Sequence, residues 1–454
     1  MIKLNNTFIF RVEYFGGVLI DRNSFVRYEL NKAETLFICA LKYINSDFET
    51  IQSIVRELLC SQVDINIDKF LKAKIITDVG KNEECSEVNH IEIKKLITEE
   101  CYRIFDGQKD VLSAPMEITI YPTLNCNLNC KFCFLKNKNM ECNELSVEEW
   151  VDIIVGAKSK GVVSISILGG EPTQYSDIDK LLCEINKIGI NTTITTNGVG
   201  LKETTKQILI QAQNIIPIVS IQALNDKNVE LMGVDYKSIL STCEELVEKN
   251  KEIRLNSVYT NQRFEDFIEI IDYCIAKGIK RYSIATYVAT NEENRDVIAH
   301  DYEEIRKLDE FLNGYIQNYY PNTKHFECSV EGCMIYSAYP ELEDELVHMT
   351  EFEKMYYGCR AGKSKVEIYA DGRVLPCICF ENEKNNTSNV RKTNLYDIWY
   401  NDKFLNLIRR SKGKSEKCLK CGFNIFCNGG CPEKRYRIYG DKFEKYADPD
   451  CKMN

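Results

Sequence analysis

The stretch MEITIYPTLNCNLNCKFC, residues 116–133, joins an apolar segment to a loop that carries three closely spaced cysteines. Cys126, Cys130 and Cys133 follow a C-x3-C-x2-C spacing. A disulfide uses two thiols, and a closed tetrahedral metal site uses four ligands. A cubane iron–sulfur cluster has four irons, so three thiolates leave one iron open to a small molecule. The spacing favours such a cluster over three unrelated thiols or a zinc site completed elsewhere.

The surrounding sequence repeats strand-like and helix-like segments. Strands are expected at 116–122, 163–168, 192–196, 216–221, 253–259 and 281–287, with helices between them. This alternation predicts parallel βα units. The strands read as continuously apolar, as in a sheet buried on both faces. Since parallel strands end at one edge, the cysteine loop should lie near the segment Gly169-Gly170-Glu171-Pro172, which follows the second strand.

Composition restricts the class of protein. The chain has 454 residues, a formal net charge of -10, 21 cysteines and four histidines. Its start lacks the pattern of a signal peptide, and no apolar run is long enough to span a membrane. We therefore expect a cytoplasmic protein without a membrane partner, whose cysteines serve metal binding or redox chemistry rather than structural disulfides. The negative charge argues against a nucleic-acid partner.

The cysteine loop and the GGEP segment together resemble the radical S-adenosylmethionine (SAM) superfamily. The resemblance implies an α/β fold, a partial (β/α)6 barrel, with a 4Fe–4S cluster on Cys126, Cys130 and Cys133. It implies that SAM binds the open iron and is cleaved to a 5′-deoxyadenosyl radical. The resemblance assigns SAM contacts to Phe132 near the adenine, to Gly169, Gly170 and Glu171 at the amino group, and to Ser220 at the ribose. Pro172 completes the cofactor-binding GGEP segment, and Gln222 stands where the family has Asp.

A second cysteine array lies between residues 359 and 451 and resembles the SPASM extension of peptide- and protein-modifying radical SAM enzymes. The resemblance implies two auxiliary 4Fe–4S clusters, three clusters in all. It assigns Cys418, Cys421, Cys427 and Cys451 to the second auxiliary cluster, and Cys359, Cys377 and Cys431 to the first. Cys328, Cys333 or Cys379 could supply the missing ligand, but none has the expected spacing, which favours an open site.

Six further cysteines fall in expected helices, where core packing is the ordinary role of a thiol. They are Cys39, Cys60, Cys101, Cys183, Cys243 and Cys274. The acidic residues along the chain do not form a pattern that identifies a catalytic acid or base.

The first 80 residues read as a separate module of three short strands and three helices, with a capping box at Asn31 and Glu34. The module resembles the winged-helix-like RiPP recognition element, which binds the leader of a ribosomally made peptide. Its ten Lys and Arg balance ten Asp and Glu, unlike a DNA-binding winged helix. We expect five segments: a recognition domain (1–80), a linker and bridging helix (81–115), a radical SAM core (116–300), a helical connector (301–350) and the SPASM domain (351–454).

Together the resemblances imply an enzyme that modifies a precursor peptide bearing a leader, with a flavodoxin or ferredoxin as electron donor. Thioether formation, as in sactipeptide and ranthipeptide maturases, is the leading reaction, because an open auxiliary iron could hold a peptide thiolate. Carbon–carbon crosslinking, decarboxylation and sulfatase-type protein maturation are the alternatives. A redox-sensing DNA-binding protein is the alternative from another class.

Overall fold

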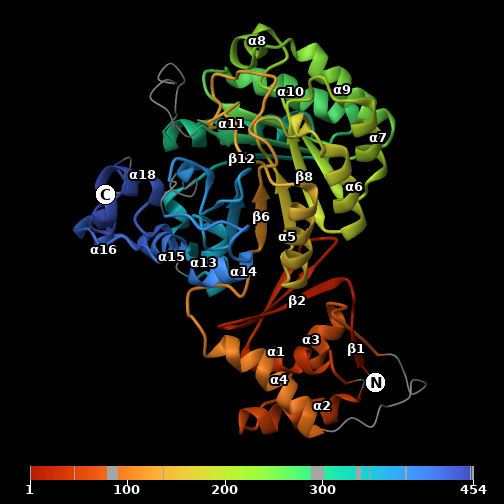
Figure 1. Ribbon diagram of the computed structural model, residues 1–454, viewed down its shortest axis with the longest axis vertical. Helices are drawn as coiled ribbons and strands as arrows, with labels where there is room; N and C mark the ends of the chain where they lie inside the picture. The colour runs from red at the N-terminus through yellow and green to blue at the C-terminus, as the bar shows by residue number, and fades with distance from the viewer. Residues whose placement is uncertain are drawn as a thin grey trace. The chain divides into compact units, whose positions relative to one another are not determined.

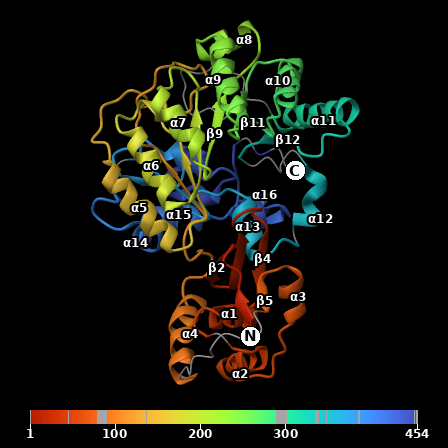
Figure 2. The same cartoon turned by 90° about the vertical axis from the view of Figure 1, so that its right-hand side faces the viewer.

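The computed structural model describes residues 2–44, 46–78, 90–135, 137–287, 301–333, 339–346, 348–383, 386–449 and 451. The chain forms two compact units. The first combines Met1–Ala114 with the short segment Ser159–Val163, and the second contains Pro115–Lys158 and Ser164–Asn454. Figures 1 and 2 show the elements of both units along the chain.

The first unit contains the three strands and three helices that the sequence predicts. β2 (Phe8–Glu13), β3 (Gly16–Asp21) and β4 (Arg27–Leu30) form an antiparallel sheet, followed by α1 (Lys32–Ala40), α2 (Phe48–Leu59) and α3 (Ile67–Lys72). The predicted capping box is confirmed, because Asn31 and Glu34 exchange side-chain and backbone hydrogen bonds at the start of α1. A further antiparallel pair, β1 (Ile2–Leu4) with β5 (Ile76–Asp78), joins the two ends of the module.

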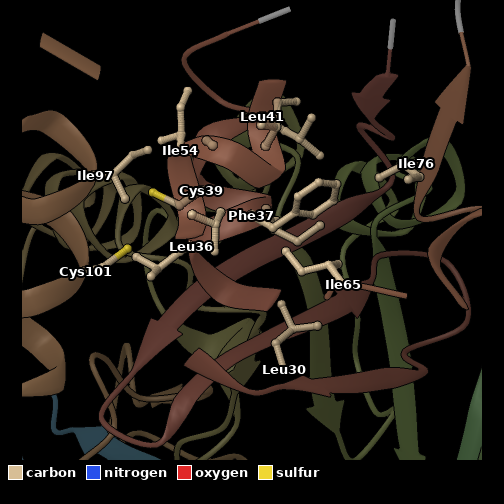
Figure 3. Close-up of a cluster of buried hydrophobic side chains, with 14 of the residues drawn as sticks. Leu30, Leu36, Phe37, Cys39, Leu41, Ile54, Ile65, Ile76, Ile97 and Cys101 are labelled. Carbon is tan, nitrogen blue, oxygen red and sulfur yellow. The ribbon is translucent and has the colours of Figure 1, made fainter. Parts of the chain in front are cut away.

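The expected bridging helix, α4 (His90–Phe105), is part of the core of the first unit. Its buried residues Ile93, Ile97, Cys101 and Phe105 join the same apolar cluster as α1. Figure 3 shows Ile97 and Cys101 beside Cys39 and other side chains of this cluster. The helix is therefore not a freely solvated segment, because its i, i+4 apolar positions pack against the module.

The predicted core role of the helical cysteines holds for four of the six. Cys39, Cys101, Cys243 and Cys274 are fully buried. Cys183 is half-buried on its helix. The prediction was wrong for Cys60, which is exposed because it caps the end of α2 in a left-handed conformation.

A buried ion pair anchors β2. The guanidinium of Arg11 lies 2.7 Å from the Glu13 carboxylate, and both side chains are buried. Arg11 also donates to the carbonyls of Ala114 (2.6 Å) and Gly161 (3.3 Å), and Glu13 accepts a 2.6 Å hydrogen bond from the backbone of Ser113. Burial raises the pKa of Glu13, while the charge of Arg11 opposes that shift. Arg11 and Glu13 thus connect β2 to the segment of Ser113 and Ala114 and to the segment of Gly161, both at the boundaries of the first unit.

Replacing Arg11 by methionine should destabilise the first unit by about 3–5 kcal/mol, because it leaves the Glu13 carboxylate buried without its cation. Urea unfolding followed by far-ultraviolet circular dichroism measures this loss. Arg11→Met combined with Glu13→Leu is the control and should recover most of the stability. A loss below about 1 kcal/mol in the single variant would show that the pair contributes little.

The second unit is built on a nine-stranded sheet in the order β12-β11-β10-β9-β8-β7-β6-β13-β14. The strands are β6 (Glu117–Ile120), β7 (Ser164–Ile167), β8 (Asn191–Thr196), β9 (Ile215–Ser220), β10 (Arg254–Tyr259), β11 (Arg281–Thr286), β12 (Glu327–Glu331), β13 (Lys365–Ile368) and β14 (Val374–Leu375). The six predicted strands, β6 to β11, are consecutive and parallel. The α/β class and partial barrel are thus confirmed. β12 and β13 extend the sheet in parallel at its two ends, from segments predicted as a connector and as the SPASM domain.

Helices connect the strands, as the repeating sequence predicts. They are α5 (Val147–Ser159), α6 (Ile178–Ile188), α7 (Glu203–Gln211), α8 (Asp226–Met232), α9 (Tyr236–Glu248), α10 (Phe264–Lys277) and α11 (Tyr302–Tyr319), with the short 3-10 helix η1 (Pro172–Gln174). Ser146 and Glu149 form the predicted capping interaction at the start of α5. In Figures 1 and 2, α5, α6, α7, α9 and α10 lie along one side of the sheet. Among the described elements between the strands, α8 and η1 were not predicted.

The central strands are buried on one face only, which corrects the expectation of a sheet buried on both. Burial alternates strictly along β8, β9 and β10. The buried face packs against α9, α10 and α11. The opposite, half-exposed face carries polar side chains such as Ser166, Thr193, Ser220 and Asn256. A polar, half-exposed face is what a barrel interior that receives a ligand requires.

The cysteine-rich part that follows consists of short elements. They are η3 (Pro340–Leu342), α12 (Glu343–Leu346), α13 (Glu351–Tyr357), η4 (Ile378–Phe380), α14 (Leu395–Asn401), α15 (Lys403–Arg409), α16 (Glu416–Lys420), α17 (Asn424–Cys427), α18 (Pro432–Tyr439) and η5 (Gly440–Lys445). Within the residues that the structure describes, no helix is both long and apolar enough to cross a membrane. The five-segment division of the chain stays a prediction.

Candidate functional site

Four loops lie at the same edge of the sheet. The cysteine loop follows β6, the GGEP segment follows β7, Thr196-Asn197-Gly198 ends β8, and Ser220 to Gln222 ends β9. Because β6 to β9 are neighbours and parallel, all four loops leave the carboxyl ends of adjacent strands. The structure therefore brings together the residues that the sequence assigns to SAM and to its cluster.

The three thiols of the cysteine loop lie close to one another. Burial, and then the charges of Cys133 and Cys126, raise the pKa of Cys130 to about 12. Burial also raises the pKa of Cys126 and Cys133, and the Lys138 ammonium opposes both shifts. The Lys138 ammonium favours the deprotonated form of these neighbouring cysteines. Such an environment suits a site that binds metal through thiolates.

Residues after the last cysteine fold back and hold the loop. The side chain of Asn139, a residue in the left-handed conformation, accepts a 2.7 Å hydrogen bond from the backbone of Cys126. Lys138 donates to the Leu128 carbonyl at 2.7 Å. The Leu128 backbone in turn donates to the sulfur of Cys126 at 3.4 Å. These contacts fix the loop conformation around its first thiol.

The two glycines of the GGEP segment allow it to lie directly against the cysteine loop. The Gly170 amide donates to the Thr123 carbonyl at 3.0 Å, and the Glu171 amide donates to the Asn125 carbonyl at 2.7 Å. A Cβ on Gly170 would lie 2.3 Å from the Asn125 carbonyl oxygen, and Gly169 adopts a φ of +151°. Only glycine permits this approach.

The backbone carbonyls of the same two glycines are available to a ligand that carries hydrogen-bond donors. Within the described part of the chain, no group donates a hydrogen bond to the carbonyl oxygen of Gly169 or Gly170. Two free carbonyls beside the three thiols match what the ammonium group of an amino acid needs, which is acceptors without competing donors.

The carboxylate of Glu171 is used within the protein. The residue is 1% exposed. It accepts hydrogen bonds from Thr196 Oγ1 (2.7 Å), the Asn197 amide (2.8 Å), and the Thr173 hydroxyl (2.8 Å) and amide (3.2 Å). Burial raises its pKa, and these hydrogen bonds oppose the shift. Glu171 therefore links the GGEP segment to the end of β8 and acts as a positioning residue.

A second link joins the cysteine loop to the end of β8. The side chain of Asn127 donates to the Val199 carbonyl at 2.9 Å and accepts from the side chain of Asn197 at 2.8 Å. The sequence pattern does not single out Asn127. An asparagine in a loop carries no local signal, because its partner lies some 70 residues further along the chain.

The remaining predicted SAM residues lie around the end of β9. Ser220 Oγ donates to Asn256 Oδ1 at 2.8 Å on the polar face. Gln222 is fully buried, and its Oε1 accepts a 2.8 Å hydrogen bond from the Val258 amide. Its Nε2 donor has no partner among the described residues. Phe132 packs at the margin of the apolar cluster formed by β9, β10 and their helices.

These residues fit a cluster that binds SAM. The three neighbouring thiols would supply the cluster ligands, the Gly169 and Gly170 carbonyls accept no hydrogen bond from a described residue, and Gln222 retains an unused amide donor. Among the described residues, no three His, Cys, Asp or Glu side chains converge closely enough to hold one metal ion. A cubane does not require such convergence, because each cysteine binds a different iron.

The C-terminal cysteines form a second region. The turn at Gly372, with a φ of +87°, leads from β13 to β14 and on to Cys377. Interaction with the Cys379 thiol, and then burial, raise the pKa of Cys377, and Cys431 is among the neighbouring charges. Burial, and then the charge of Cys359, raise the pKa of Cys431. The predicted set Cys359, Cys377 and Cys431 is thus gathered in one place.

The structure separates the spare cysteines. Cys333 is exposed, but it lies close enough to Cys359 and Cys379 for their charges to raise its pKa, so Cys333 and Cys379 both lie near the predicted set. Cys328 instead pairs with Tyr282 in the sheet and packs on the apolar cluster of the barrel. Two of the three alternatives therefore lie near the first auxiliary set.

Among the other four predicted ligands, Cys418 lies against a tightly packed glycine. A Cβ on Gly413 would lie 2.8 Å from the sulfur of Cys418 and 2.7 Å from the Cα of Gly429. Lys417 Nζ donates to the Cys451 carbonyl at 3.0 Å, which holds Cys451 beside the helix that carries Cys418. The fully buried Arg435 lies close to this region; burial lowers its pKa, and Cys427 and Cys418 oppose the shift.

Comparison with known proteins identifies both halves of the site. Residues 120–305 match the radical SAM superfamily, and residues 359–422 match SPASM, an iron–sulfur cluster-binding domain. SuiB of Streptococcus suis bound to precursor peptide SuiA is 35% identical, with all of both chains covered and a TM-score of 0.85. SuiB bound to S-adenosylmethionine is 34% identical, with the same coverage and a TM-score of 0.84. PqqA peptide cyclase of Rhizobium meliloti is 25% identical over 346 residues, which cover 74% of this chain and 87% of the cyclase.

The relation to SuiB extends over the full length of both chains and includes the first unit, the barrel and the cysteine-rich part. The family matches cover the cysteine loop with the GGEP segment, and most of the C-terminal cysteine array. The chain therefore belongs to the radical SAM superfamily and is a radical SAM enzyme with a SPASM iron–sulfur cluster-binding domain.

Proposed function

We propose that the protein is a maturase that crosslinks a ribosomally made precursor peptide. The observation that supports this most is the three-thiol loop packed against the GGEP segment, whose glycine carbonyls accept no hydrogen bond from a described residue, on a chain that resembles SuiB from end to end. SuiB has been crystallised with the precursor peptide SuiA, and the first unit of this chain, which resembles a RiPP recognition element, is the proposed site for the leader. Peptide leaders bind such modules by adding a strand to a sheet edge.

The proposed cofactors are three 4Fe–4S clusters and SAM. Cys126, Cys130 and Cys133 would hold the first cluster. The auxiliary clusters would be held by Cys359, Cys377 and Cys431, and by Cys418, Cys421, Cys427 and Cys451. When bound, the first cluster and SAM supply a 5′-deoxyadenosyl radical that removes a hydrogen atom from the peptide.

The chain's own residues would position SAM. The carbonyls of Gly169 and Gly170 accept hydrogen bonds from its ammonium group, and Glu171 fixes these carbonyls through its bonds to the end of β8. Gln222 Nε2 offers a donor to the ribose hydroxyls, and Ser220 lies beside it on the polar face. Phe132 offers an apolar surface to the adenine.

The bond formed depends on the first auxiliary site. A thioether requires an open iron that takes a peptide thiolate, which is the prediction from the spacing of Cys359, Cys377 and Cys431. The positions of Cys333 and Cys379 beside this set support a cluster ligated by protein alone. This observation favours carbon–carbon crosslinking over thioether formation, because a fully ligated cluster has no position for the thiolate.

Replacing Cys379 by alanine tests the closed site. If Cys379 is the fourth ligand, the anaerobically purified variant should lose up to about four of about twelve irons per chain. Iron and sulfide analysis, with absorbance near the visible charge-transfer band, measures the loss. Cys333→Ala tests the other neighbour, and Cys183→Ala on α6 is the control. Full iron content in both single variants and in the double variant would exclude a closed site and restore thioether formation as the favoured reaction.

Co-expression of the enzyme with the small peptide encoded beside its gene tests the function itself. Either crosslink lowers the peptide mass by two hydrogens. Alkylation with iodoacetamide then distinguishes the bonds, because a thioether removes one reactive thiol and a carbon–carbon bond removes none. A larger mass loss would indicate decarboxylation, and an unchanged peptide would contradict the proposal.

A further inference from the structure

The C-terminal part of this acidic chain is strongly basic. Residues 403–449 contain twelve Lys and Arg but only five Asp and Glu, whereas the whole chain has a net charge of -10. Nine of the twelve cations are exposed: Lys403, Arg410, Lys412, Lys414, Lys417, Lys420, Arg437, Lys442 and Lys445. Such a separation of charge creates a positive field over one part of the molecule, which attracts an acidic partner.

Part of this basic segment lies directly on a proposed cluster ligand. Lys412 and Lys414 flank Gly413, whose missing Cβ would come within 2.8 Å of the Cys418 sulfur. The Gly413 carbonyl also accepts a 3.0 Å hydrogen bond from the side chain of Asn424, three residues before Cys427. The two lysines therefore stand at the surface immediately outside the second auxiliary site.

Hydrogen bonds hold further lysines near the same place. The Lys414 amide donates to the Glu444 carbonyl at 2.8 Å, which brings the neighbouring Lys445 alongside. Lys417 donates to the Cys451 carbonyl, and Lys420 lies one turn further along the helix of Cys418. We call Lys412, Lys414, Lys417, Lys420 and Lys445 the basic patch.

Exposed apolar side chains accompany the basic patch. Leu419, next to Cys418, is 70% exposed, and Ile425, two residues before Cys427, is 50% exposed. Lys412 and Lys445 form no ion pair with any described residue, so their charges are available to a partner. A few apolar side chains within a rim of cations suit a small, transient interface whose encounter is steered by charge.

We propose that the basic patch docks an acidic one-electron carrier protein, so that electrons enter the enzyme through the second auxiliary site. This inference rests on the proposed function, which requires an electron for each SAM cleaved. In the step, the carrier loses one electron and an iron–sulfur centre of the enzyme gains it. The precursor peptide is a less suitable occupant, since its proposed binding site is the first unit.

The test uses the reconstituted full-length enzyme with an acidic flavodoxin in its hydroquinone form. The variant Lys412→Glu/Lys445→Glu reverses two unpaired charges of the basic patch. The matched control, Lys202→Glu/Lys249→Glu, reverses two exposed lysines that cap the ends of α7 and α9 and also form no ion pair with described residues. Stopped-flow absorbance measures the electron-transfer rate, and carbodiimide crosslinking with mass spectrometry locates the lysines that contact flavodoxin carboxylates.

At low ionic strength the patch variant should accept electrons about tenfold more slowly than the wild type, and the control should not. Crosslinks in the wild type should fall on the basic patch. Unchanged rates in the patch variant, or crosslinks confined to other surfaces or to the peptide-binding unit, would overturn the inference. Dithionite separates the two proposals: the patch variant should cleave SAM normally with it, whereas a wild type that fails with dithionite would contradict the proposed function.

Discussion

Replacing Cys130 by alanine should lower reductive SAM cleavage by at least about 1,000-fold, because it removes a group on which the reaction depends entirely. The Cys130 thiol is close enough to Cys126 and Cys133 for their charges to shift its pKa, and the three form the only ligand set proposed for the SAM-binding cluster. Chromatography of 5′-deoxyadenosine formed with dithionite measures the loss. The variant should keep about eight of about twelve irons, since the auxiliary sets are intact.

Cys183→Ala is the matched control for this variant. Cys183 lies half-buried on α6 and belongs to no proposed ligand set. It should retain full iron content and the wild-type rate of SAM cleavage. If Cys130→Ala formed 5′-deoxyadenosine at the wild-type rate, the cysteine loop would not be the site of the radical cluster.

Replacing Gly170 by alanine should weaken SAM binding by about 10- to 100-fold, corresponding to the 1–3 kcal/mol typical of overpacking. The added Cβ would lie 2.3 Å from the carbonyl oxygen of Asn125 and 2.5 Å from that of Leu124. Both neighbours are backbone atoms, so the GGEP segment must move away from the cysteine loop. The carbonyls of Gly169 and Gly170 would move with it. Equilibrium binding of SAM to the reconstituted variant measures the effect.

Gly156→Ala controls for the general effect of adding a methyl group at a glycine. Gly156 lies within α5, and a Cβ there would meet nothing within 4 Å. This variant should bind SAM normally and be slightly more stable, since alanine favours a helix by about 1 kcal/mol over glycine. Equal SAM affinity in Gly170→Ala and the wild type would contradict the proposed role of the glycine carbonyls.

The sequence was sufficient for the parts of the site that local patterns determine. The order of strands and loops placed Cys126 and Gly169 at the ends of neighbouring parallel strands, because a βα repeat permits few arrangements. The capping pairs at Asn31 and at Ser146 were also predictable, since both partners lie within four residues of each other.

Contacts between distant segments were not predictable in the same way. The prediction of continuously apolar strands missed the polar face that carries Ser166 and Asn256, because these side chains alternate with isoleucine and leucine along their strands. The engagement of Glu171 with Thr196 and Asn197 depends on how two loops meet, which no local spacing encodes.

Contacts between segments distant in sequence are also the reason why the additional strands and the packing of α4 were not predicted. β12 and β13 join the sheet through pairing with β11 and β6, far away in sequence. α4 packs into the first unit although residues 79–89 separate it from β5 along the chain. Segment boundaries read from composition therefore do not reveal which core a helix or strand joins.

One isotope experiment tests the central claim most directly. The reconstituted enzyme is reduced with dithionite and given SAM and a precursor peptide deuterated at its carbon-bound positions. The account predicts 5′-deoxyadenosine that carries one deuterium, together with a peptide that has lost two hydrogen isotopes. Unlabelled 5′-deoxyadenosine with an unchanged peptide, or no cleavage of SAM, would contradict it.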